Sequence, residues 1–397
     1  MNEKCKNVLL MTWYNSTNYG TMLQCRATTL LLENRYNTNV YLPNYYPHGE
    51  LTSKIIVKKV LSPIVWRRHA KIALSKIRAL PVKRLLAKKS DMVRKFNSDY
   101  NYALDGREIK CKEDFEELSS KFDLFVTGSD QIWNPDFLNP RYLLDFVSDD
   151  KHCIAIASSI CRDTIPAEKQ LLYKNNLRKF ELVTIREYNM VHQLSNILDR
   201  DVYCILDPTL LLGRDVWKER MRRTEKSNYV LLYTLGESAF IRKEALAFAK
   251  SKRKKLLYFP QIDGLYKNRD KMIEKESVAV WDADPYEWIG LIDAADYVIT
   301  DSFHMTAFSI MLHKNFWTVP KEAKDSSQNA RILNLLSVVG LTERFIDQNS
   351  DFSFCSHETE IEWKDVDEKL NRKRISDLKL FDNYFESYLK HSDGEDN

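Results

Sequence analysis

Short apolar runs alternate with amphipathic stretches along this 397-residue chain, and this pattern restricts its fold more than any other feature. Each run has the length of a buried strand, and the stretches between the runs have the length of helices. Strands that alternate with helices of about 10–15 residues favour parallel sheets covered by helices on both faces. We therefore expect an α/β protein. The predicted strands are, in chain order, "NVLLMTW", "NVYLPNY", "DLFVTGSD", "CIAIASSI", "LVTIRE", "VYCILDP", "YVLLYTLG", "KKLLYFP", "DYVIT" and "NFWTVP".

The series of strands breaks between Asp207 and Asn228 and then restarts. The chain is also too long for one ordinary core, and two domains of about 150–200 residues are expected at this length. We predict two Rossmann-like domains that face a cleft. Their expected ranges are 1–207 for the N-terminal domain, with a basic insertion at 51–95, 208–350 for the C-terminal domain, and 351–397 for a helical segment that packs back on the N-terminal domain.

The basic insertion 51–95 carries fourteen Lys or Arg residues against one acidic residue, Asp91, which gives a local charge of +13. The whole chain has a net charge of +4, so the remainder carries −9. Apolar residues interleave with the charges, which suits an anionic membrane surface or a lipid diphosphate held there. A solvated helical insertion explains the same pattern. No DNA- or RNA-binding motif accompanies it, so we do not expect nucleic acid as a partner.

The seven cysteines form no C-x-x-C pair, and several lie inside apolar runs. Such thiols are typical of a reducing compartment. The apolar stretch near the N-terminus is too short for a signal peptide, and no window approaches the ~20 apolar residues of a membrane span. We expect a cytoplasmic protein that the basic insertion holds at the inner face of the cytoplasmic membrane. The eight histidines lack metal-ligand spacing, so neither a metal nor a cofactor is expected.

Polar clusters follow several predicted strands, where ligands bind in open parallel sheets. The first cluster, "NSTNYGTMLQ", contains Asn18, Tyr19 and Gly20 just before a helix expected from about Met22 to Tyr36. Gly20 there lets backbone N–H groups approach a ligand, and the helix N-terminus favours an anion. A strand–helix turn capped by Asn or Thr explains the cluster equally well.

The second cluster, "VTGSDQIWNP", contains Ser129, Asp130, Gln131 and Trp133. Asp130 and Gln131 are suited to holding hydroxyl groups, and the face of Trp133 is suited to stacking on a sugar ring. Because loops positioned by a sheet often carry binding residues, we favour a binding site here. The alternative is a Gly/Asn-Pro loop that Trp133 anchors in the core.

The third and fourth clusters supply a cation and a histidine. Arg186 ends the strand of "TIREY", where it can bind phosphate or carboxylate, or form a structural ion pair with Glu187 or Asp207. In "TDSFHMTAFSI", Asp301 or Ser302 is suited to capping a helix. His304 lies in the first turn of that helix, beside an apolar stripe, and capping does not explain it. We therefore expect His304 to act in catalysis.

The clusters together resemble the bacterial polysaccharide pyruvyl transferase family. The resemblance rests on "NYGTMLQ", "GSDQIWNP", "TIREY" with "DPT", and "TDSFHMTAFSIMLHKNF", which run in family order over about residues 7–340. It implies a two-domain fold similar to the GT-B glycosyltransferases. It also implies transfer of an enolpyruvyl-derived unit from phosphoenolpyruvate to a sugar of a lipid-linked surface-glycan precursor, as in capsule or exopolysaccharide, to form a pyruvate ketal.

The resemblance also implies roles for single residues. His304 would be the acid/base, with Asp301 orienting it. Many family members carry Arg two residues before this His, where the present chain has Ser302. Another cation must then bind the phosphoenolpyruvate anion. The expected donor-binding residues are Ser302, Thr306, Arg186 and Arg331, and the expected acceptor-binding residues are Asn18, Tyr19, Gly20, Ser129, Asp130, Gln131 and Trp133.

Two other functions fit the same sequence. One is a GT-B glycosyltransferase that uses a nucleotide sugar, because this fold supports many functions. The other is a non-catalytic sugar-binding protein of the surface-glycan machinery. Phosphoenolpyruvate-dependent turnover distinguishes the pyruvyl transferase from both.

Overall fold

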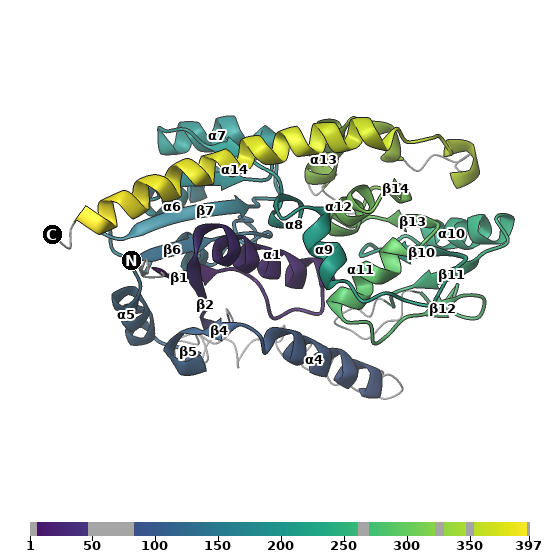
Figure 1. Ribbon diagram of the computed structural model, residues 1–397, viewed down its shortest axis with the longest axis horizontal. Helices are drawn as coiled ribbons and strands as arrows, with labels where there is room; N and C mark the ends of the chain where they lie inside the picture. Colours follow the sequence, from purple (N-terminus) through teal and green to yellow (C-terminus); the bar gives the residue numbers. More distant parts are fainter. Residues whose placement is uncertain (1–5, 47–82, 261–269, 322–328, 347–352, 395–397) are drawn as a thin grey trace.

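The computed structural model describes residues 6–46, 83–260, 270–321, 329–346 and 353–394 (Figure 1). Over these ranges the chain forms two α/β domains, each built on its own parallel sheet. The predicted α/β class with two parallel-sheet domains is confirmed. Most of the basic insertion, residues 51–82, lies outside the described residues.

The N-terminal sheet has seven described strands in the order β4-β2-β1-β6-β7-β8-β9, and its strand pairs are parallel. β6 and β8 are buried along their whole length because helices cover both faces of the sheet. A short parallel pair, β3 with β5, lies apart from this sheet. The bounds are β1 (Lys6–Met11), β2 (Thr38–Leu42), β3 (Asn44–Tyr45), β4 (Asn101–Tyr102), β5 (Glu108–Ile109), β6 (Leu124–Thr127), β7 (His152–Ser158), β8 (Leu182–Ile185) and β9 (Tyr203–Cys204).

Helices connect these strands, and α1 is buried along most of its length. α1 begins at Tyr19, earlier than predicted, because the side chain of Asn18 caps it by accepting a hydrogen bond from the Gly20 N–H. The bounds are α1 (Tyr19–Tyr36), α4 (Lys83–Asn97), α5 (Lys112–Lys121), α6 (Ala167–Leu177), α7 (Tyr188–Leu198), α8 (Pro208–Leu211) and α9 (Arg214–Arg220), with 3₁₀ turns at Ala103–Gly106 and Pro140–Leu143.

The C-terminal sheet has five described strands in the order β12-β11-β10-β13-β14, again in parallel pairs. Its strands are β10 (Tyr229–Tyr233), β11 (Lys255–Tyr258), β12 (Val278–Ala279), β13 (Tyr297–Thr300) and β14 (Asn315–Thr318). Its helices are α10 (Ala239–Ser251), α11 (Pro285–Asp293), α12 (Phe303–Met311) and α13 (Ala330–Val339), with 3₁₀ turns at Thr342–Arg344 and Phe354–His357.

The final helix, α14 (Trp363–Gly394), crosses both domains along one side of the molecule (Figure 1). At its start, the Trp363 ring stacks on His313 of the C-terminal domain, with centroids 4.6 Å apart. Farther along, Asp382 pairs with Arg35 of α1 at 2.7 Å. The segment that was expected to return to the N-terminal domain therefore contacts both domains.

The two domains share one apolar core, which runs from the N-terminal sheet through α1 to α11 and α12. At the interface the Tyr19 ring stacks on Trp288 with centroids 5.4 Å apart, and its hydroxyl donates to the Ala283 carbonyl at 2.9 Å. This packing holds the carboxyl ends of the two sheets in a fixed relation. No helix in the described ranges is long and apolar enough to span a bilayer.

Candidate active site between the two domains

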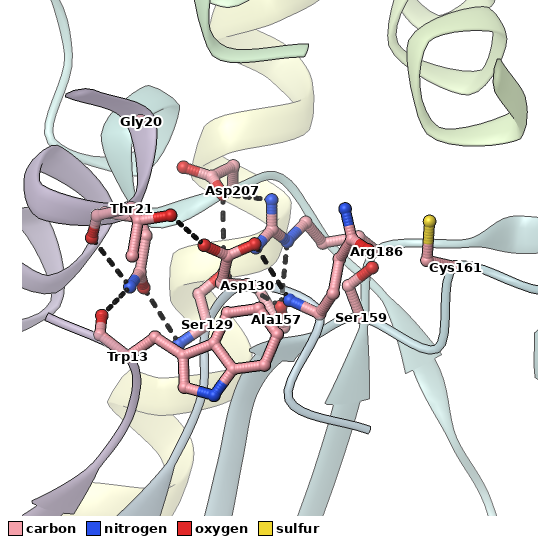
Figure 2. Close-up of polar contacts among 12 residues, drawn as sticks. Trp13, Gly20, Thr21, Ser129, Asp130, Ala157, Ser159, Cys161, Arg186 and Asp207 are labelled. Atoms are coloured by element: carbon pink, nitrogen blue, oxygen red, sulfur yellow. Dashed lines mark hydrogen bonds and ion pairs between the residues drawn. The ribbon is translucent and has the colours of Figure 1, made fainter. Parts of the chain in front are cut away.

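Arg186 lies at the centre of the candidate site. It follows β8 directly, and its side chain is only 2% exposed. Its Nε donates to the Ala157 carbonyl at 3.1 Å, and its Nη1 lies 2.7 Å from Oδ2 of Asp207. Nη2 lies 4.0 Å from Oδ1 of Asp130, so the guanidinium sits between two carboxylates (Figure 2). The carboxyl ends of β6, β8 and β9 bring these three residues together.

Asp207 joins the two domains. Its Oδ1 caps α8, accepting from the backbone N–H of Thr209 at 2.9 Å and from the Thr209 hydroxyl at 2.6 Å. Its Oδ2 faces Arg186 and also lies 3.6 Å from Nε2 of His304, which belongs to the C-terminal domain. Burial alone would raise the pKa of Asp207, but the charges of Arg186 and His304 hold it below its usual range. Asp207 is therefore a carboxylate at neutral pH.

His304 lies in the first turn of α12, as predicted, and is 6% exposed. Its Nε2 has no hydrogen-bond partner among the described residues. The ring packs against Gly20 of α1, where a Cβ atom would fall 2.1 Å from Nδ1. Gly20 therefore makes room for the imidazole, whereas the sequence led us to expect that it made room for a ligand.

Two arginines flank the ring of Phe303. The guanidinium carbon of Arg186 lies 5.4 Å from the ring centroid, and that of Arg331 lies 5.6 Å from it. Burial opposes the charge on Arg331, but Cys161 and the carboxylates of Glu187, Asp130 and Asp207 raise its pKa. Arg331 is therefore a cation, as cation–π packing on Phe303 requires.

A cavity of about 510 Å³ opens between the domains beside these arginines. Arg186 and Asp207 line it from the N-terminal domain, while Phe303 and Arg331 line it from the C-terminal domain. Lys373 of α14 lines it as well. His304 does not line this cavity, but its imidazole lies 3.6 Å from Asp207, which does. The cavity lining therefore combines three cations with the acidic residues Asp207 and Asp377.

Asp301 does not orient His304, and that prediction is wrong. Its carboxylate accepts the backbone N–H groups of Leu235 at 2.7 Å and Gly236 at 2.6 Å, which fixes the loop between β10 and α10. Burial raises the pKa of Asp301. Asp207 is the carboxylate beside His304 instead, because the N-terminal domain supplies it across the interface.

The two hydroxyl residues of α12 have structural partners. Ser302 caps the helix, since its Oγ accepts the N–H of Met305 at 3.5 Å. Thr306 is fully buried, donates to the Ser302 carbonyl at 2.9 Å and lies 2.8 Å from the Thr318 hydroxyl. The capping interpretation of Ser302 is confirmed, and the prediction that Thr306 binds the donor is wrong because its hydroxyl points into the core.

Trp133 and Tyr19 are core residues, which corrects their prediction as acceptor-binding residues. Trp133 is fully buried, and its Nε1 donates to the Tyr142 carbonyl at 2.9 Å. Tyr19 is 1% exposed, at the domain interface. Neither ring has a face free for a sugar.

The polar residues of the two N-terminal clusters form a connected network (Figure 2). Asp130 accepts from the Thr21 hydroxyl at 2.6 Å, and its other oxygen accepts the Gln131 N–H at 2.9 Å. The Ser129 hydroxyl donates to the Ala157 carbonyl at 2.9 Å. Gln131 is partly exposed at the edge of this network. The sequence analysis did not single out Thr21.

Two further residues, neither of them proposed from the sequence as a site residue, hold the loops of the site. Gln24 donates to the Trp13 carbonyl at 2.7 Å and accepts the Ser129 N–H at 3.1 Å, so it joins the loops after β1 and β6. Glu187 accepts the Ser159 hydroxyl and two backbone N–H groups of the loop after β7. A buried amide in an apolar helix is a sequence signal that could have identified Gln24.

No group of His, Cys, Asp or Glu side chains with the geometry to hold a metal ion occurs within the described ranges. The side chains at the site are cationic, anionic and aromatic. Such a site can bind an anion, hold an imidazole beside a carboxylate and exclude water from both.

Comparisons with known proteins add the following. A model of the polysaccharide pyruvyl transferase family matches residues 18–320. No curated protein matches the sequence of the chain. Three solved structures have a similar overall shape. UDP-GlcNAc 2-epimerase from Neisseria meningitidis has a TM-score of 0.48 and 9% identity, and the match covers 97% of this chain and 94% of that one. An α-glucosyltransferase in complex with UDP has a TM-score of 0.45 and 8% identity, with coverage of 98% and 95% of the two chains. A glycosyltransferase of avilamycin A biosynthesis has a TM-score of 0.46 and 10% identity, with coverage of 98% of both chains.

The family match begins within the first sequence cluster, includes the other three and covers most of the chain. The chain belongs to the polysaccharide pyruvyl transferase family.

Proposed function

We propose that this protein transfers a pyruvyl group from phosphoenolpyruvate to a sugar of a lipid-linked surface-polysaccharide precursor and forms a pyruvate ketal. The observation that carries the proposal is the meeting of Arg186, Asp207, His304 and Arg331 between the two domains of a chain in this family. Cations for the donor and a histidine for proton transfer are what this reaction needs.

The donor site of the proposal is the cavity between the domains. Phosphoenolpyruvate carries a phosphate and a carboxylate, and guanidinium groups bind both in a bidentate manner. Neither the terminal nitrogens of Arg186 nor the Nε of Arg331 has a hydrogen-bond partner among the described residues, but Arg186 already forms an ion pair with Asp207 at 2.7 Å, and no such pair of Arg331 occurs in those ranges. Arg331 therefore takes the place of the arginine that many family members carry where this chain has Ser302.

The reaction needs one proton donor and two acceptor hydroxyls. His304 protonates the methylene carbon of the donor, the first hydroxyl oxygen attacks the neighbouring carbon, and the bond from that carbon to phosphate breaks. The second hydroxyl then closes the ketal. Of the two hydroxyl protons, one replaces the proton that His304 gave up, and the other leaves with phosphate.

Asp207 orients His304, as a buried carboxylate orients the imidazole in other acid–base pairs. In the free protein His304 does not line the cavity, whereas Asp207, 3.6 Å from its Nε2, does. The proposal therefore requires His304 to approach the donor when substrate binds. Catalytic hydrogen bonds commonly tighten only in the substrate complex.

A thermal-shift titration tests the donor assignment. Phosphoenolpyruvate should raise the unfolding temperature of the wild-type protein, because a ligand present at about 100 times its Kd adds about 2.7 kcal/mol of stability. Arg331→Met should lose this shift. Arg178→Met is the matched control, because Arg178 is exposed and pairs with Asp149 outside the cavity. A larger shift with a UDP-sugar than with phosphoenolpyruvate would favour a glycosyltransferase instead.

The lipid-linked acceptor and the membrane surface are part of the same proposal. They rest on the +13 charge of residues 51–95, of which the structure describes only the stretch from Lys83 onward, in α4. We expect the protein to float with vesicles that contain anionic lipid and not with neutral ones. Equal recovery with both kinds of vesicle would remove the membrane from the proposal.

A further inference from the structure

A second cavity, of about 470 Å³, lies in the N-terminal domain beyond the carboxyl end of β1. Aromatic and amide side chains dominate its lining. Two of its rings are unusually open for their size, with Phe137 53% exposed and Tyr46 41% exposed. Its lining includes Trp13, Asn15, Tyr46, Phe137, Asn139 and Thr21.

No charged side chain lines this cavity within the described ranges. That separates it from the cavity between the domains, which Arg186, Arg331 and Lys373 line. A neutral lining does not offset the desolvation cost of a phosphate or a carboxylate. The second cavity is therefore suited to a neutral ligand.

The aromatic rings form a shallow platform. The Trp13 and Phe137 rings pack against each other, with centroids 5.7 Å apart and an angle of 32° between their planes, and Phe137 remains 53% exposed beside the partly buried Trp13. A pyranose has one face of C–H bonds and a rim of hydroxyl groups. A platform of partly exposed rings covers the apolar face of such a ring and leaves the rim for polar groups.

Amide and hydroxyl groups border the platform. The Asn15 Nδ2 donates to the Tyr46 hydroxyl at 2.8 Å, and the Asn139 Nδ2 donates to the Tyr45 hydroxyl at 2.6 Å. These bonds fix the orientation of both amides. Among the described residues, no hydrogen bond engages the Asn15 carbonyl oxygen or the Tyr46 hydroxyl proton, and both are suited to sugar hydroxyls, which donate and accept.

Thr21 connects the second cavity to the candidate active site. It lines the cavity, and its hydroxyl donates to Oδ2 of Asp130 at 2.6 Å. The other oxygen of Asp130 lies 4.0 Å from Nη2 of Arg186. A sugar on the aromatic platform would thus direct one edge past Thr21 towards Asp130 and the donor.

We propose that this cavity is the acceptor subsite, which binds a neutral pyranose on Trp13 and Phe137 and directs its reacting hydroxyls towards Asp130. The inference rests on the proposed function for the identity of the reaction, but the binding of the sugar does not need the donor. It replaces Trp133, which the structure buries, with the exposed ring of Phe137 and the partly exposed ring of Trp13.

Sugar binding without donor tests the subsite. Saturation-transfer NMR would use methyl β-galactopyranoside, methyl β-glucopyranoside and a methyl N-acetylmannosaminide at millimolar concentration. At least one should give a signal with the wild-type protein, and Phe137→Ala should weaken it about tenfold or more. Phe240→Ala is the matched control, because Phe240 is a 38% exposed phenylalanine in the other domain. No signal with any of the three sugars, or equal signals in both variants, overturns the subsite.

A turnover assay separates the subsite from the reaction. If the protein releases phosphate from phosphoenolpyruvate, Phe137→Ala should raise the KM of the acceptor about tenfold and leave the KM of phosphoenolpyruvate unchanged. An unchanged acceptor KM would remove the subsite while the pyruvyl transfer stands. Sugar binding that depends on Phe137, without phosphoenolpyruvate turnover, would keep the subsite and remove the proposed reaction.

Discussion

The contact between Gly20 and His304 allows a direct test of the interdomain site. In Gly20→Ala the new methyl carbon would fall 2.1 Å from Nδ1, 2.4 Å from Cγ and 2.9 Å from Cβ of His304. Ordinary van der Waals contact begins at 3.4 Å, so the imidazole must move by about 1.3 Å, the difference between 3.4 and 2.1 Å. That displacement also changes its 3.6 Å separation from Asp207.

A misplacement of about 1 Å of a catalytic group costs about 10²-fold in rate. We therefore expect Gly20→Ala to lower kcat by about two orders of magnitude. Its effect on folding should be smaller, because overpacking costs about 1–3 kcal/mol and alanine recovers about 1 kcal/mol of helix propensity. Steady-state phosphate release and thermal unfolding measure the two effects separately.

Gly106→Ala is the matched control for this prediction. Gly106 has φ +75°, so an alanine there is strained, but its Cβ would meet only Tyr102 at 3.8 Å, away from the site. The control should lose stability and keep the wild-type kcat. Wild-type turnover in Gly20→Ala would refute the assignment of His304 to the reaction.

Three further predictions follow from the buried polar residues. The pKa of Asp207 is below its usual range, so the ionised carboxylate stabilises the fold above about pH 4, and this contribution is lost as the pH falls through the lowered pKa. Asp207→Asn should therefore flatten the acid side of the plot of unfolding free energy against pH. It should also lower kcat at least about 10²-fold. Asp301→Asn should cost about 1–3 kcal/mol of unfolding free energy in urea denaturation, because one loop N–H loses its acceptor. If Asp301→Asn stays folded but loses as much kcat as Asp207→Asn, Asp301 takes part in catalysis and its structural assignment is wrong. Trp133→Phe should remove the bond to the Tyr142 carbonyl, lower stability by about 1 kcal/mol and leave the acceptor KM unchanged; a raised acceptor KM would contradict its place in the core.

The sequence predicted the parts of the fold that depend on local pattern. The apolar runs became parallel strands, and the polar clusters fell at their carboxyl ends, because strands and helices have distinct periods. The capping role of Asn18 followed from the same local chemistry. Arg186 and His304 were identified because a polar residue at a strand end or in a first helical turn stands out against apolar neighbours.

The partners of these residues could not be predicted in the same way. Asp301 is three residues from His304 in sequence, yet the residue that contacts the imidazole is Asp207, 97 positions away in the numbering and in the other domain. Such pairing depends on how the two sheets face each other. Trp133 and Trp13 are both tryptophans after a strand, and only the packing around each ring decides which one is buried.

The most direct test of the central claim is phosphate release from phosphoenolpyruvate by the purified full-length protein with lipid-linked oligosaccharides as acceptors. If the protein is a pyruvyl transferase that uses His304, we expect acceptor-dependent release and a mass gain on the glycan that matches one pyruvate ketal. Both should be lost in a folded His304→Ala variant. Release that continues unchanged in His304→Ala would contradict the assigned mechanism. No release with any acceptor, together with stabilisation by a sugar nucleotide, would contradict the proposed reaction itself.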